Sequence, residues 1–284
     1  MIQQLVHQLE KEAVNVSHSC RALGISRSGY YAAQRAAAAR KVCPITPVLK
    51  AAFAASGSTY GSRRLSVALC AGGLVVGRFR VRRLMRDAGL RPVWRRKFIH
   101  TTNSRHGLPV AENILDRRFD PPARNQAWVG DITYIRTRSG WLYLAIVLDL
   151  YSRKVIGWAT AAAMPADLVC RAMRLALAQR TPAPGLIFHS DRGSQYASAE
   201  YQQLLQEHAA VSSMSRVGNC WDNAVAERFF LNLKMERVWQ RDYANHQEAA
   251  RDVADYIVTF YNESRLNSKL NYLTPNAFEQ RQAA

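Results

Sequence analysis

The chain has 284 residues, of which 48% are hydrophobic, and its 39 Lys and Arg against 21 Asp and Glu give a net charge of +18. Such a length supports one or two domains with a small module added, and no apolar run approaches the roughly 18 residues of a membrane-spanning helix. The amino terminus lacks the form of a signal peptide and the five scattered cysteines contain no C-x-x-C pair, so the sequence predicts a soluble intracellular protein with neither a disulfide framework nor a zinc site.

The positive charge is concentrated in the first part of the chain. Residues 1–110 hold 19 Lys and Arg against 3 Asp and Glu, a balance of +16, whereas residues 111–284 hold 20 against 18, a balance of +2. An asymmetry of this size indicates a polyanionic partner, and nucleic acid is the first candidate. A charge that serves solubility alone is the alternative. No lipid-anchoring motif or long basic amphipathic helix favours a membrane.

The first predicted elements are two short helices on either side of Gly24. Residues 16–23 form the first, and Ser26 is a plausible N-cap of a second helix that carries tyrosine and arginine. This is the spacing of a helix-turn-helix, whose second helix can enter the major groove of DNA. Many helical hairpins also have a glycine in the turn, so residues 1–45 are interpreted as a helix-turn-helix-like segment.

A second helical DNA-binding unit is predicted for residues 46–92. One helix ends at Gly72, and the next, about residues 78–88, has one apolar and one basic face. A solvated charged face is the ordinary explanation of such a stripe, but almost no acidic residue is interleaved, so contact with phosphate is preferred. The arginines of the basic face are Arg78, Arg80, Arg82, Arg83 and Arg86.

Residues 93–126 have no clean period and contain three prolines, which predicts an extended basic linker. The segment either lies along DNA or only connects two domains. Its candidate DNA contacts are Arg95, Arg96 and Lys97.

Residues 127–284 are predicted to form an α/β domain. Three runs rich in β-branched and aromatic residues follow one another with short turns, which indicates an antiparallel meander. An amphipathic helix, a short buried strand, a second helix, a brief strand and a final helix follow. This order predicts a mixed sheet flanked by helices. The ranges are 128–137, 141–152 and 154–161 for the meander, then 166–180, 185–191, 198–209, 210–215 and 215–238.

Three acidic residues of this domain form a candidate catalytic site. Asp131 lies within the first strand, Asp191 at the end of the fourth and Glu227 on the final helix, and strand ends of an α/β sheet can converge on one face. Carboxylates brought together repel unless divalent metal neutralises them. All-oxygen ligands fit Mg²⁺ or Mn²⁺ better than zinc, and two such ions are the standard means of in-line phosphodiester attack. Asp149 remains open as a fourth acid or a turn former.

The final helix places an amide and a base near its glutamate. Lys234 follows Glu227 by seven residues, about two turns, and Asn223 precedes it by four, so the three share a face. Lys234 would meet a phosphate or base, and Asn223 would steady the glutamate or the DNA. Without the other motifs, an ordinary surface pair is the simpler explanation. Arg192, directly after Asp191, is a further candidate for a DNA contact.

Two tryptophans and one histidine near these positions receive structural interpretations. Trp221 and Trp158 are expected in the core rather than in base-stacking positions, although Trp221 lies beside the predicted site and stays a candidate for stacking. His189, within a predicted strand, is expected to have a structural partner.

Four stretches together resemble the DDE catalytic core of bacterial insertion-sequence transposases, namely "WVGDITYI", "YLAIVLDLYSRKVIGWA", "FHSDRGSQYAS" and "SMSRVGNCWDNAVAERFFLNLKMERV". They are most similar to the insertion-sequence-three family, whose core is similar to retroviral integrase and has a ribonuclease H-like fold. The resemblance covers nearly the whole chain, including "YGSRRLSVALCAGGLVVGRFRVRRLMRDAGL" and "YNESRLNSKLNYLTPNAFEQ". Arg228 and Asn267 depart from the common pattern, and neither is one of the acids.

The resemblance implies that Asp131, Asp191 and Glu227 are the family's metal-binding catalytic acids, with 35 residues between the last two. It also places Lys234 at the family's basic position. The implied activity is that of a DNA transposase, which frees a 3′-hydroxyl at the element's end by hydrolysis. That hydroxyl then attacks a second phosphodiester without a covalent protein intermediate. Members typically join one end to the other and proceed through a circular intermediate.

The same resemblance implies double-stranded DNA as partner, as terminal inverted repeats and as target, with a homodimer or larger assembly on the DNA. Family members are often frameshift fusions, and this chain looks like the downstream reading frame, so an upstream-frame partner is expected. A bacterial, cytoplasmic and nucleoid-associated location follows. The alternatives are a catalytically silent DNA-binding regulator and a plain metal-dependent nuclease. The intact acids count against the first.

Overall fold

The computed structural model describes residues 8, 14–38, 43–93, 108–217 and 219–283. The chain divides into two compact units, residues 1–51 and 52–284. Over the described ranges, none of the helices combines the length and the apolar character needed to cross a membrane. The predicted DNA contacts Arg95, Arg96 and Lys97 lie outside the described residues.

The first unit contains a pair of short helices, α2 (Val16–Ala22) and α3 (Arg27–Ala38). The hydroxyl of Ser26 accepts a hydrogen bond at 3.1 Å from a backbone N–H in the first turn of α3, which caps that helix as predicted. Cys20 of α2 and Tyr30 of α3 are buried together in a small apolar cluster. The prediction of two helices in this segment is confirmed.

Three further helices follow, α4 (Ile45–Ala55), α5 (Ser62–Ala71) and α6 (Arg78–Asp87). α5 and α6 pack against each other and bury the apolar side chains of both helices. The remaining surface of α6 faces solvent because an amphipathic helix buries only one face. All five arginines of the predicted basic face are exposed, namely Arg78, Arg80, Arg82, Arg83 and Arg86.

The rest of the second unit is built on a five-stranded sheet of order β3-β2-β1-β4-β5. β1, β2 and β3 form the predicted antiparallel meander, whereas β4 runs parallel to β1 and β5 runs parallel to β4. The predicted mixed sheet is therefore confirmed. The strands are β1 (Ala127–Thr137), β2 (Gly140–Asp149), β3 (Val155–Ala161), β4 (Ile187–Ser190) and β5 (Val211–Met214).

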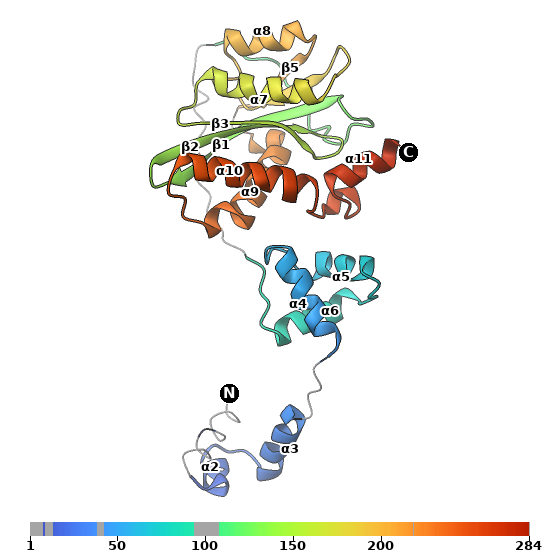
Figure 1. Ribbon diagram of the computed structural model, residues 1–284, viewed down its shortest axis with the longest axis vertical. Coiled ribbons are helices and arrows are strands. Elements are labelled where there is room, and N and C mark those ends of the chain that lie inside the picture. The colour runs from blue at the N-terminus through green and yellow to red at the C-terminus, as the bar shows by residue number, and fades with distance from the viewer. Residues whose placement is uncertain (1–7, 9–13, 39–42, 94–107, 218, 284) are drawn as a thin grey trace. The chain divides into compact units, whose positions relative to one another are not determined.

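Helices cover both faces of this sheet (Figure 1). α7 (Ala166–Gln179) and α8 (Ala199–Glu207) share one apolar core with the sheet. α9 (Ala224–Glu236) and α10 (His246–Asp255) share a second core on the opposite face. A π-helical turn, Tyr256–Asn262, extends α10, and α11 (Pro275–Ala283) follows after a short 3-10 turn, Ser268–Leu270. These layers are the ribonuclease H-like α/β architecture expected from the sequence.

The start of α9 differs from the sequence prediction. The sequence predicts Asp222 and Asn223 in the first turns of one helix, whereas the structure places them in a separate 3-10 helix, η1 (Cys220–Asn223), and α9 begins at Ala224. Short polar side chains that bond elsewhere compete with regular helix formation. Both side chains are buried and turned toward other parts of the domain, which explains the break.

Candidate active site

The register of two parallel strands brings Asp131 and Asp191 to the same level of the sheet. Val129 of β1 lies opposite His189 of β4, and the pairing ends there. Asp131 follows Val129 by two residues, and Asp191 follows His189 by two residues. Paired strands lie about 4.8 Å apart within a sheet, so the two aspartates leave the paired region side by side. β1 continues well past this point while β4 ends. The two acids therefore lie where the edge of β1 becomes open.

α9 brings the third acid, Glu227, close to this pair. Burial of the Asp131 carboxyl raises its pKa well above the usual range, and the charges of Asp191 and Glu227 raise it further. A hydrogen bond of 2.8 Å from the Ile132 N–H and the charge of Lys234 act in the opposite direction. The carboxylates are therefore close enough to repel one another.

The three acids do not form a complete ion site by themselves. Within the described ranges, no group of three or more His, Cys, Asp or Glu side chains is arranged so that it could hold a metal ion. The donors that the three acids offer are all carboxylate oxygens, the ligands that hard divalent cations such as Mg²⁺ prefer. The chemistry of the residues thus fits a divalent metal site.

Lys234 lies beside the acids on the same side of α9 as Glu227. Its Nζ is 4.5 Å from the centre of the Tyr134 ring of β1, which is the distance of a cation–π contact. Burial lowers the pKa of Lys234, and the nearby Asp131 raises it in part. Glu227 and Lys234 both influence the pKa of Asp131. The two side chains therefore face the same way from α9, as their spacing of about two helical turns predicts.

Asn223 is buried in the domain next to the backbone of Gly130, the residue before Asp131. Its side chain is 4% exposed, and its Nδ2 donates a hydrogen bond of 3.2 Å to the carbonyl oxygen of Gly130. Gly130 directly precedes Asp131, and a Cβ at this position would lie 2.5 Å from the Phe188 ring. Asn223 therefore steadies the backbone next to Asp131. Its burial leaves almost no surface for a direct DNA contact.

Arg192 joins the two loops that flank the acids. Its Nε donates a hydrogen bond of 2.6 Å to the carbonyl oxygen of Ser215, which follows β5. On the same loop, Oδ1 of Asp191 accepts a hydrogen bond of 2.9 Å from the N–H of Gly193. A Cβ at Gly193 would lie 3.0 Å from that oxygen, so glycine permits the tight turn. The Nε of Arg192 therefore links the loop after β4 to the end of β5.

A buried ion cluster fixes the chain just before α9. The carboxylate of Asp222 is 0% exposed and accepts hydrogen bonds of 2.8 to 2.9 Å from the guanidinium groups of Arg117 and Arg216. The backbone N–H of Arg216 and the amide of Asn113 each add a bond of 3.0 Å. These contacts hold the pKa of Asp222 far below its usual range, and the side-chain hydrogen bonds from Arg216 make the largest contribution.

The sequence did not reveal this cluster, because its members come from distant parts of the chain. Asn113 and Arg117 lie 109 and 105 residues from Asp222, within the segment predicted as a basic linker. The same segment is further attached by the N–H groups of Ile114 and Leu115, which donate to Ser213 Oγ at 3.0 and 3.1 Å. No local pattern marks such contacts.

His189 has the structural partners that its strand position predicts. Ser213 Oγ already accepts two backbone hydrogen bonds, so its own hydrogen is available to Nδ1 of His189 at 2.9 Å. Nε2 then donates to Ser215 Oγ at 3.2 Å, and that hydroxyl donates to the carbonyl oxygen of Ser190. This chain of bonds suits the neutral imidazole, and burial lowers the pKa of His189 to about 4.

We expect His189 to make the fold sensitive to acid. An unfolded histidine titrates near 6.5, so the unfolded state binds the proton first as pH falls, and stability is lost progressively between pH 6.5 and about 4. The loss corresponds to about 3 kcal/mol at the lower limit. Urea unfolding of wild type and His189→Gln at pH 7 and pH 4.5 measures it. Equal pH dependence in the two proteins would contradict the assignment.

Asp149 is a turn former and not a fourth acid of the site. Its carboxylate is 0% exposed and accepts hydrogen bonds of 2.9 Å from the backbone N–H groups of Asn125 and Tyr151. Burial raises its pKa, and these two bonds lower it in part. The side chain thereby closes the turn after β2, which resolves the alternative that the sequence left open.

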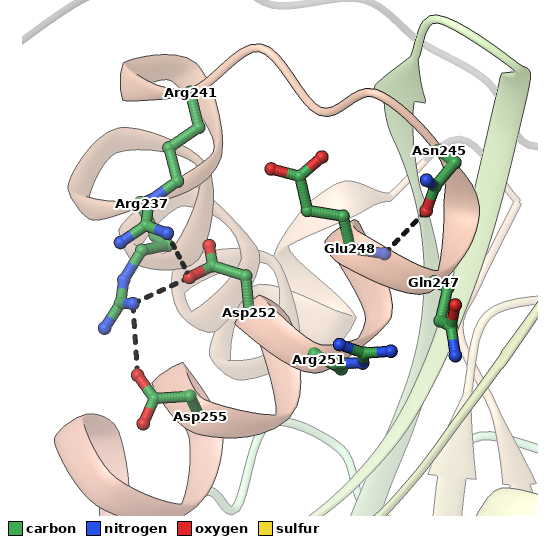
Figure 2. A pocket seen from close by; sticks show the side chains of 8 residues that line it. All are labelled: Arg237, Arg241, Asn245, Gln247, Glu248, Arg251, Asp252 and Asp255. Atoms are coloured by element: carbon green, nitrogen blue, oxygen red, sulfur yellow. Dashed lines mark hydrogen bonds and ion pairs between the residues drawn. The ribbon is translucent and has the colours of Figure 1, made fainter.

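A separate cavity of about 470 Å³ lies after the C-terminal end of α9, and none of the three acids lines it (Figure 2). Its charged side chains neutralise one another. Arg237 and Arg241 both contact Asp252, at 2.9 and 2.6 Å, and Arg237 also contacts Asp255 at 3.1 Å. Tyr243 donates to the other oxygen of Asp252 at 2.7 Å. This network holds the chain between α9 and α10 together.

Comparison with known proteins defines the class. Residues 121–220 and 210–275 match two family models described as integrase core domain, and residues 45–98 match one described as HTH-like domain. Among solved structures, the catalytic core domain of HTLV-2 integrase in complex with magnesium is similar, with a TM-score of 0.42 and 16% identity over 55% of this chain and 97% of that one. The family models thus define an integrase-core protein with an HTH-like domain.

Two relatives specify the family. The transposase InsF of insertion sequence IS3A from Escherichia coli is 40% identical over 98% of this chain and 97% of its own length. A protein of insertion element IS600 from Shigella sonnei is 42% identical over 92% of this chain and 97% of its own. The chain belongs to the IS3 family of insertion-sequence transposases.

Proposed function

We propose that the protein is a DNA transposase that hydrolyses a phosphodiester at the ends of an insertion sequence. It then joins the freed 3′-hydroxyl to DNA by metal-dependent strand transfer. The observation that carries the proposal is the strand register that sets Asp131 beside Asp191, with Glu227 near enough to raise the pKa of Asp131. The name of the Escherichia coli relative supports the same activity.

In this proposal Asp131, Asp191 and Glu227 are the catalytic residues and hold two Mg²⁺ ions, for which Mn²⁺ can substitute. Burial, and then the charges of Asp191 and Glu227, raise the pKa of Asp131, so a bound divalent cation would favour its ionised form. When bound, the ions supply activation of the attacking oxygen and stabilisation of the leaving oxygen. The protein's part is to hold the carboxylates at the open edge of β1, where a DNA strand can reach them.

Lys234 is proposed to bind a phosphate of the DNA end. Its ammonium group lies beside Asp131 and is held against the Tyr134 ring, so it is a positioned cation next to the acids. Arg192 lies on the loop after β4 and is proposed as a second contact. Asn223 contributes indirectly, through the backbone of Gly130.

The DNA partners are proposed to be the terminal inverted repeats and the target, held by a homodimer or larger assembly. The exposed arginines of α6, together with Arg95, Arg96 and Lys97, would contact phosphates. The proposed domains are a helix-turn-helix-like segment (1–45), a helical DNA-binding domain (46–92), a basic linker (93–126) and the catalytic domain with its C-terminal helical extension (127–284). Residues 113–117 of the linker segment bond to the catalytic domain.

Removal of two arginines from α6 is expected to weaken DNA binding uniformly across sequences. Each phosphate contact makes the slope of log affinity against log salt more negative by about 0.9. The double variant Arg82→Ala/Arg83→Ala should therefore decrease the magnitude of this slope by about 2. Fluorescence anisotropy over a salt series measures it. The matched control is Arg171→Ala/Arg174→Ala on α7, where both arginines lie near Asp167. An unchanged slope in the α6 variant would show that Arg82 and Arg83 do not contact DNA phosphates.

The test of the function is a cleavage and joining assay with DNA that carries the element's ends, compared with DNA in which the ends are scrambled. We expect end-specific nicking and strand joining in Mg²⁺ or Mn²⁺ and none in EDTA. Cutting without joining would indicate a nuclease. End binding without chemistry, even after addition of the upstream-frame product, would indicate a DNA-binding regulator.

A further inference from the structure

Trp221 is 69% exposed, although the sequence predicts it in the core. It belongs to η1, six residues before Glu227. Val217, on the same loop, is 74% exposed. Single exposed apolar residues are common in proteins, but a tryptophan loses a large favourable burial when it stays in water. The prediction of a core position for Trp221 was wrong. The exposed indole lies just before α9, the helix that carries Glu227.

The residues that follow Trp221 are held from two directions. Asp222 is fixed by Arg117, Arg216 and Asn113, and Asn223 is fixed by the carbonyl oxygen of Gly130. Successive residues of η1 therefore point to different places, two of them inward and Trp221 outward. A residue presented by an anchored backbone loses less conformational entropy on binding than one on a free loop.

The surface around η1 is basic. The side chains of Arg117 and Arg216, which bond to Asp222, remain 44% and 47% exposed. Arg117 and Arg216 are balanced by Asp222 and by Asp116, which lies 3.4 Å from Arg216, and the exposed Arg118, bonded to the carbonyl oxygens of Ile114 and Leu115, leaves these five charges at +1. An exposed aromatic ring within positive potential is the combination by which proteins hold unpaired nucleic-acid bases, the ring by stacking and the cations by attraction of the backbone.

We propose that Trp221 is a base-stacking residue, whose indole packs against a base that leaves the duplex at the DNA end near the phosphate to be cut. The inference rests on the proposed function, since it requires DNA at the open edge of β1. Arg117 and Arg216 have a double role, because they anchor Asp222 and, together with Arg118, present exposed guanidinium groups to the neighbouring phosphates.

The test uses the full chain and end-bearing DNA with 2-aminopurine placed in turn at each position around the scissile phosphate, in EDTA so that only binding is read. Wild type should change the fluorescence at one or two positions, and Trp221→Ala should lose that change while Trp221→Phe retains part of it. Binding to ends with pre-unpaired bases should weaken about 5-fold to 140-fold in Trp221→Ala, because one stacked base contributes about 1 to 3 kcal/mol. Val258→Ala, at another exposed apolar residue, is the control.

Equal 2-aminopurine signals and equal affinities for wild type and Trp221→Ala would overturn the inference. A Trp221→Ala variant that changes the sedimentation coefficient without changing any base signal would also overturn it, since a second copy of the chain would then cover the indole. Failure of the proposed function is a different result, because wild type would then bind DNA without metal-dependent cutting. Thermal unfolding of Trp221→Ala should match wild type, as expected for an exposed side chain.

Discussion

Replacement of Asp131 by asparagine is expected to abolish cleavage and joining while DNA binding is retained. Both Asp191 and Glu227 lie near enough to this carboxylate to raise its pKa. An amide keeps the shape but carries no charge to hold a divalent cation. Metal ions contribute several kcal/mol of transition-state stabilisation, and each 1.36 kcal/mol is a factor of ten in rate, so the loss should reach about 10³-fold or more.

Single-turnover cleavage in Mg²⁺ measures this loss, and thermal unfolding supplies an independent readout. Mg²⁺ or Mn²⁺ should stabilise wild type, because a ligand that binds only the folded state raises its stability, and should have little effect on Asp131→Asn. Asp167→Asn is the control, because that aspartate is exposed on α7. Cleavage by Asp131→Asn within tenfold of wild type would show that this acid does not hold the metal.

Replacement of Asp222 by asparagine is expected to slow single-turnover cleavage by about 10²-fold. The neutral amide cannot accept the charge-assisted bonds of Arg117 and Arg216, so η1 and the start of α9 lose their anchor. Glu227 lies in the first turn of α9 and moves with it. A misplacement of about 1 Å in a catalytic group costs on the order of 10²-fold.

A positioning role for Asp222 can be separated from a purely structural one. If Asp222 positions Glu227, the metal concentration that gives half-maximal cleavage should rise in Asp222→Asn, whereas a change in stability alone would lower the melting temperature and leave that concentration unchanged. The matched control is Asp242→Asn, which also removes an Arg–Asp pair. Both members of that pair, Arg138 and Asp242, are largely exposed, and such pairs contribute about 0 to 1 kcal/mol.

The local order of the chain follows from the sequence alone. Alternation of apolar residues marks β1 to β3, amphipathic periods mark α6 to α8, and capping residues such as Ser26 and Ser198 mark helix starts, because each of these signals depends on neighbours within a few residues. The acidic spacing and the surrounding motifs were also sufficient to identify the family. The charge asymmetry pointed to DNA for the same reason, since it depends only on composition.

Tertiary structure decided the features that depend on partners far along the chain. The register of β1 with β4 sets Asp131 beside Asp191, and no local pattern encodes that register. The break before α9 arises because Asp222 finds two arginines, one of them 105 residues away. The same anchor leaves Trp221 exposed and turns Asn223 inward. Sequence periodicity reports which face of an element is apolar, whereas burial of a polar side chain requires a hydrogen-bonding partner that only the folded chain supplies.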